Sequence, residues 1–103
     1  MNLIIKFMSK EDIIEEINRN LPFLKDKYHV KQLGVFGSVA RDEQTDESDV
    51  DILVEFSSPI GFFDFIRLEN FLEEKLKKKV DLVSKKGLKN TIRKEVLKET
   101  IYV

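Results

Sequence analysis

The N-terminal part of the chain has the apolar spacing of an amphipathic helix. Apolar residues recur every four positions, at Ile13, Ile17 and Leu21. Ser9 followed by Asp12 has the spacing of a capping box, with Asp in place of the usual Glu or Gln, and predicts a helix start near residue 10. Pro22 is expected to end or kink this helix, with helical structure resuming before residue 28.

Two further helices are predicted after residue 60. The first runs from about 63 to 77, with one apolar stripe formed by Phe65, Leu68, Leu72 and Leu76. The second runs from about 89 to 99, with Ile92 and Val96 expected to face inward. Along the chain, these helical segments alternate with extended segments.

Three segments have the pattern of strands. Residues 33–36 form a short apolar run that ends in a turn at Gly37. Apolar residues recur at every second position from 50 to 56, at Val50, Ile52, Val54 and Phe56. Residues 80–83 form a third strand, too short to stand outside a sheet. Residues 42–48 hold nothing apolar and predict a surface loop. Strands alternating with helices predict an α/β (α+β) fold with a small sheet flanked by helices, in one domain over residues 1–103.

The composition excludes several classes of site, and the charged residues are distributed unevenly along the chain. The chain has no cysteine and one histidine, His29, so disulfides, a thiolate nucleophile and Cys/His metal cages are excluded. No apolar run approaches the roughly 20 residues that span a bilayer, and we expect a cytoplasmic protein without a membrane partner. Residues 1–60 hold seven basic and twelve acidic residues, and residues 61–103 hold eleven and seven. The acidic part is where a metal site is expected. The basic part could face phosphates, nucleic acid or an acidic partner, and a solvated lysine-rich face explains it equally well and is preferred.

The Asp49-Val50-Asp51 segment is the main candidate for metal chemistry. Residues i and i+2 of a strand point to the same face about 6.5 to 7 Å apart, so both carboxylates can reach one point in front of the sheet. Asp is depleted in strands, and two unpaired carboxylates would destabilise one unless a cation lay between them. Mg²⁺ fits these oxygen ligands. The alternative is a strand end whose Asp pair faces solvent.

Two other features could complete such a site. Asp81 reaches the same face if its strand pairs beside residues 50–56, where it could hold a second ion or activate a hydroxyl; the alternative is an ion pair with one of the lysines at 77–79. Gly37-Ser38 follows a strand, and its backbone N–H groups and hydroxyl could hold phosphate. The alternative for Ser38 is an ordinary N-cap.

Together these residues resemble the minimal nucleotidyltransferase (MNT) group of the DNA polymerase β superfamily. The resemblance lies in the Gly-Ser turn at 37–38 with Arg41, ten residues, Asp49-x-Asp51, and Asp81 in a later short strand, and it covers nearly the whole chain. It implies a nucleotidyltransferase fold with a small mixed sheet. Many relatives have Gly after the arginine, whereas this chain has Asp42.

The resemblance also implies roles for these residues. Asp49, Asp51 and Asp81 would be catalytic carboxylates and ligands of two Mg²⁺ ions, with ATP as substrate, and Gly37, Ser38 and Arg41 would bind the nucleotide. Arg41 is equally open to an ion pair with the acidic residues at 42, 46 or 47.

The resemblance further implies a toxin–antitoxin pair. This chain would be the antitoxin that transfers AMP to a tyrosine of a HEPN-domain toxin encoded by a neighbouring gene. The alternative is a non-catalytic module that neutralises its partner by contact alone. Transfer to a small molecule such as an aminoglycoside would require a substrate domain, for which nothing after Gly87 is long enough. Nucleic acid is not expected as a partner, and both homo- and hetero-oligomers are open.

Overall fold

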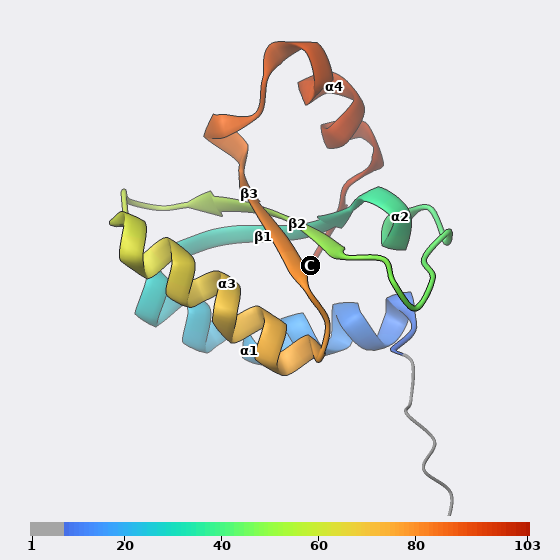
Figure 1. The fold of residues 1–103 in the computed structure, drawn as a ribbon. Helices are drawn as coiled ribbons and strands as arrows, with labels where there is room; N and C mark the ends of the chain where they lie inside the picture. Colours follow the sequence, from blue (N-terminus) through green and yellow to red (C-terminus); the bar gives the residue numbers. More distant parts are fainter. Residues whose placement is uncertain (1–7) are drawn as a thin grey trace, which may run out of the picture.

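The computed structural model describes residues 8–103, which form a four-stranded mixed sheet with helices on both faces (Figure 1). The strands are β1 (Val30–Phe36), β2 (Val50–Phe56), β3 (Val80–Ser84) and β4 (Ile101–Tyr102), in the order β3-β2-β1-β4. β1 is antiparallel to β2 and to β4, and β2 is parallel to β3. The predicted α+β fold with a small mixed sheet is confirmed.

The helices divide between the two faces of the sheet. Helices α1 (Lys10–Tyr28) and α3 (Phe62–Leu76) pack side by side under one face. On the other face lie α4 (Asn90–Glu99) and the short 3₁₀ turn η1 (Lys85–Gly87) that precedes it (Figure 1). The one-turn helix α2 (Gly37–Ala40) leads from β1 into the acidic loop. This arrangement leaves the α4 face only partly covered.

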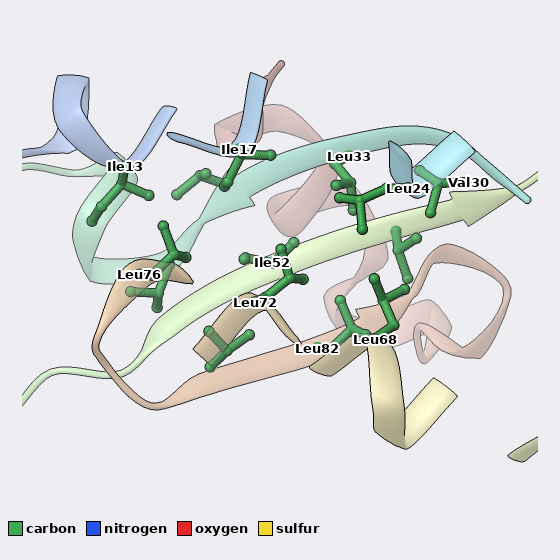
Figure 2. Close-up of a cluster of buried hydrophobic side chains, with 14 of the residues drawn as sticks. Ile13, Ile17, Leu24, Val30, Leu33, Ile52, Leu68, Leu72, Leu76 and Leu82 are labelled. Atoms are coloured by element: carbon green, nitrogen blue, oxygen red, sulfur yellow. The ribbon is translucent and has the colours of Figure 1, made fainter. Parts of the chain in front are cut away.

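The main core lies between the sheet and the α1–α3 pair (Figure 2). Its side chains come from the stripes that the sequence predicted on both helices and from the inward positions of three strands. The labelled members are Ile13, Ile17, Leu24, Val30, Leu33, Ile52, Leu68, Leu72, Leu76 and Leu82. A smaller cluster on the other face joins Leu53 to Leu88 and Val96. The side chains of β2 that point away from the main core therefore lie under α4 or beside it.

Helix α1 continues through Pro22 to Tyr28, so the helix does not end at this residue, while the helical structure predicted before residue 28 is present. Proline lacks the N–H for one intrahelical bond, which weakens a helix from within. Here Pro22 is exposed, while Leu24 and Tyr28 beyond it are buried against the sheet and hold the last turns in place. The predicted start is confirmed, because Ser9 and Asp12 form a complete capping box.

The C-terminal segment differs from expectation in two places. Val96 is buried as predicted, but the side chain of Ile92 is 49% exposed, and its predicted inward orientation is wrong. Strand β4 has only two residues and pairs with Gly34 and Val35, a contact that no periodicity could indicate. β4 thus forms the edge of the sheet beside β1.

The β3 edge of the sheet is closed by carboxylates of α3. Glu73 Oε2 accepts a hydrogen bond from the N–H of Val80 at 3.0 Å, and Glu69 Oε2 accepts one from the N–H of Leu82 at 3.0 Å. The two glutamates lie one helical turn apart, which matches the spacing of alternate strand residues.

Within residues 8–103, no helix combines the length and apolar character needed to cross a membrane.

Candidate active site

Asp51 and Asp81 lie directly opposite each other on the parallel strands β2 and β3. Neighbouring strands are about 4.8 Å apart, and side chains at paired positions of parallel strands point to the same face. That face is the α4 side of the sheet, because Leu53, two residues after Asp51, packs in the cluster beneath α4. The structure thus brings together two of the three predicted carboxylates.

The surroundings of Asp51 favour its protonated form. Burial is the largest of the causes that raise the pKa of Asp51 to about 6, and the negative charges of Asp81 and Asp49 are the next; Arg41 opposes the shift, and Glu99 contributes weakly to it. A carboxylate that is partly desolvated among other carboxylates is stabilised by a bound cation. The shift therefore marks Asp51 as the centre of the acidic group.

Asp49 lies one residue before β2 begins, and its side chain is exposed. Its charge still acts on Asp51, which places it in the same electrostatic group. Asp81 is also exposed and forms no ion pair with another of the described residues, so the predicted alternative, a bridge to a lysine at 77–79, is not found. Lys78 donates instead to the backbone oxygen of Thr45 at 2.8 Å.

The Gly37 turn packs against the Asp51 carboxylate. Gly37 has φ +70°, a left-handed conformation that other residues rarely adopt, and a Cβ there would lie 2.0 Å from Asp51 Oδ2. Pairing of Phe36 with Asp51 brings β1 to this point. Only glycine permits the backbone of the turn to lie this close to the metal-site candidate.

Ser38 lies inside α2 and is not an N-cap. The capping position is Phe36, and the hydroxyl of Ser38 makes no hydrogen bond to any residue in the described range 8–103. The Ser38 carbonyl accepts a bond from the N–H of Glu43 at 2.8 Å, which folds the loop back on the turn. The hydroxyl is therefore available to a ligand next to Gly37.

Glu99, a residue that the sequence analysis did not identify, accepts hydrogen bonds from donors of the Gly37 turn. The N–H of Gly37 donates to Glu99 Oε1 at 3.1 Å, and Arg41 Nη1 donates to Glu99 Oε2 at 3.0 Å. Arg41 Nε also donates to Glu43 Oε1 at 2.9 Å, so its ion pairs are with Glu43 and Glu99 rather than with the predicted acidic residues at 42, 46 or 47. These hydrogen bonds raise the pKa of Arg41 above its ordinary value, and the bond to Glu43 has the largest effect. No sequence signal links Glu99 to Gly37, because 62 residues separate them.

The position after Arg41 explains how Asp42 replaces the glycine of many relatives. Asp42 has φ +59°, and Asp tolerates this left-handed conformation better than most residues. Its carboxylate also accepts a hydrogen bond from Lys10 Nζ at 2.9 Å. Asp42 therefore occupies a left-handed backbone position that ordinarily favours glycine.

The donor set suits a hard cation that shares its ligands with a substrate. Among residues 8–103, no three His, Cys, Asp or Glu side chains lie close enough together to hold a metal ion by themselves. Mg²⁺ commonly takes one or two protein carboxylates and completes its shell with water and substrate phosphate. The paired carboxylates of Asp51 and Asp81 fit this open kind of site.

Comparison with known proteins identifies the family. Residues 9–103 match the family model described as the nucleotidyltransferase domain. A Thermococcus cleftensis protein named protein adenylyltransferase MntA is 42% identical over 96 residues, which cover 93% of this chain and 97% of that protein. A solved structure assigned as a minimal nucleotidyltransferase has a TM-score of 0.80 at 36% identity and covers 93% of this chain and 97% of its own.

A more distant structure has the same fold. It contains a tri-AMPylated Shewanella oneidensis HEPN toxin in complex with its MNT antitoxin, and it matches with a TM-score of 0.58 at 20% identity over 90% of this chain and 66% of that chain. The sequence motif, the paired carboxylates and these matches agree with one another. The chain belongs to the nucleotidyltransferase domain family, as its motif indicated.

Proposed function

We propose that this protein transfers AMP from ATP to a tyrosine hydroxyl of a HEPN-domain toxin and thereby acts as an antitoxin. The observation that carries the proposal is the pairing of Asp51 with Asp81 beside the Gly37 turn. Nucleotidyl transfer needs carboxylates and groups that donate hydrogen bonds to phosphate within one site. Two comparisons support it. The Thermococcus relative is named a protein adenylyltransferase, and the Shewanella structure pairs an MNT antitoxin with an AMPylated toxin.

Each residue has a separate part in the proposed reaction. Asp49 and Asp51, with Asp81, would hold Mg²⁺, which when bound neutralises triphosphate charge. The Gly37 N–H and the Ser38 hydroxyl donate to the β and γ phosphates. The Asp81 carboxylate takes the proton of the acceptor hydroxyl as the hydroxyl oxygen bonds to the α phosphorus. The bond from the α phosphorus to the bridging oxygen breaks, and pyrophosphate leaves.

A transfer assay tests this proposal. The protein is incubated with ATP, Mg²⁺ and the HEPN-domain product of the adjacent gene, and the latter is weighed by mass spectrometry. We expect an AMP-sized gain on a tyrosine that is lost in Asp51→Asn and Asp81→Asn and retained in Asp26→Asn, an exposed aspartate on α1. Neutralisation of the toxin by both variants without any mass gain would favour the contact-only alternative instead.

A further inference from the structure

A cavity of about 550 Å³ lies at the other end of β2 from the carboxylates. It is formed where β2 and β3 end, between the turn before α3 and the start of η1. Apolar side chains form part of its wall, among them Ile60 and Phe65. Its volume lies within the roughly 300 to 1,000 Å³ of ligand sites, and ligands of open α/β sheets commonly bind at the carboxyl ends of parallel strands.

Three basic side chains also line the cavity. Lys85, Lys86 and Arg93 line it, and Glu55 is the one acidic residue among the described lining residues. Lys85 Nζ lies 3.6 Å from Glu55 Oε1, and Arg93 Nη1 donates to the backbone oxygen of Lys85 at 2.8 Å. Lys86 is exposed and forms no ion pair within the part of the chain that the structure describes. The described lining residues therefore carry three positive charges and one negative charge.

Two phenylalanines stand exposed beside the cavity. Phe62 and Phe63 lie between the lining residues Ile60 and Phe65, and they are 72% and 73% exposed. Their rings contact each other edge to face with centroids 5.8 Å apart. Phenylalanine side chains this exposed are characteristic of surfaces that a partner covers.

We propose that the cavity, its basic rim and Phe62–Phe63 together form the docking site for an acidic segment of the acceptor protein that carries an apolar anchor. The anchor fills the space beside Phe65 and Ile60, and carboxylates on either side of it pair with Lys86 and Arg93. The inference rests on the proposed protein acceptor and names the surface that recognises it. We call this surface the Phe–Lys face.

Charge decides between this occupant and a second copy of the chain. A two-fold dimer would place the Phe–Lys face against itself, which brings lysine and arginine side chains of like charge together. An acidic segment meets the same side chains with opposite charge. The exposed phenylalanine pair also favours a protein over nucleic acid, because the surface combines apolar anchors with a small number of cations.

The position of the Phe–Lys face suits an acceptor. Glu55 at the cavity and Asp51 at the carboxylate site lie on one strand, four residues apart, which corresponds to about 13 Å. Leu53 and the residues of α4 that cover it lie between the two sites, so an acceptor anchored in the cavity spans this distance around α4 rather than along β2. The docking site therefore supplies binding energy away from the reacting hydroxyl while holding it near the α phosphorus.

The test separates acceptor recognition from nucleotide binding. Phe62→Ser/Phe63→Ser and Lys86→Glu are compared with Lys25→Glu, an exposed lysine on α1 under the other face of the sheet. The HEPN-domain product of the adjacent gene is the acceptor. Its Kd is measured by calorimetry, its KM by AMP transfer, and the Kd of Mg–AMP-PNP checks that each variant is folded.

We expect both Phe–Lys variants to raise the Kd and the KM for the acceptor at least tenfold, with kcat and the Mg–AMP-PNP Kd changed less than twofold and the Lys25→Glu control unaffected. An unchanged acceptor Kd in both variants overturns the inference. So does a wild-type dimer in analytical ultracentrifugation that these substitutions dissociate, or binding of a single-stranded RNA that they abolish while acceptor binding persists. Wild-type protein that binds the acceptor through this face but transfers no AMP contradicts the proposed function instead.

Discussion

Replacing Glu99 with Gln tests how the nucleotide enters the site. In the structure the Glu99 carboxylate accepts from the N–H of Gly37 and from Arg41, two of the three residues expected to bind the nucleotide. A phosphate that binds Gly37 must displace this carboxylate or lie beside it. Gln keeps the size and an acceptor oxygen but removes the negative charge. Glu99→Gln is therefore expected to bind ATP more tightly than the wild type.

The magnitude follows from the charges involved. Two unit charges about 5 Å apart repel by about 1 to 3 kcal/mol for effective dielectric constants between 80 and 20. The Glu99 side chain is 28% exposed, which places the effect near the lower limit because solvent screens the charge. We expect a gain of about 1 kcal/mol, or roughly a fivefold lower Kd.

Calorimetry with Mg–AMP-PNP measures this change directly. The matched control is Glu95→Gln, which removes a carboxylate one helical turn earlier on α4, where the side chain is exposed. The control should leave the Kd unchanged. Weaker binding in Glu99→Gln would refute the reasoning, because it would show that the carboxylate holds the turn and Arg41 in the conformation that binds nucleotide.

Three other predictions concern stability. Because the pKa of Asp51 rises from 3.8 to about 6 on folding, its contribution to stability is present below pH 4 and lost as the pH rises through 6. The free energy of this pKa shift is discounted because Asp51 is partly exposed. At pH 7.5 without Mg²⁺, Asp51→Asn should therefore stabilise the fold by roughly 1 kcal/mol and raise Tm by about 5 °C, whereas no gain is expected at pH 3.5. An equal gain at both pH values would contradict this. Gly37→Ala should cost about 2 kcal/mol in denaturant unfolding and weaken Mg–AMP-PNP binding, since its φ is +70° and its Cβ would meet Asp51; unchanged affinity would argue against the close approach. Glu69→Ala/Glu73→Ala should lower the free energy of unfolding by about 2 kcal/mol, because two strand N–H groups lose their acceptors, and an unchanged denaturation midpoint would show that water replaces them.

The parts of the molecule that follow local rules could be predicted from the sequence. The capping box at Ser9, the stripe on α3 and the alternation of β2 each depend on residues that are close in the chain, and all three are observed. The resemblance in motif also singled out Asp51 and Asp81, and the parallel pairing of β2 and β3 places these two residues side by side.

The parts that depend on tertiary packing could not be predicted. Pro22 remains inside α1 because burial of Leu24 and Tyr28 outweighs the loss of one helical hydrogen bond. Glu99 reaches Gly37 only because β4 pairs with β1 and so brings the end of α4 to the turn. Ile92 is exposed because α4 presents only a narrow stripe to the small cluster around Leu53.

The glutamates that close the β3 edge limit how this protein can associate. An open edge strand offers unpaired N–H and C=O groups to which another chain can add a strand. Here the outward N–H groups of Val80 and Leu82 already have acceptors from the molecule's own helix. A visiting polypeptide therefore gains little by lengthening the sheet beside Asp81, and it must be recognised by side chains. The strand that carries a proposed catalytic carboxylate is thus kept from becoming a seed for aggregation.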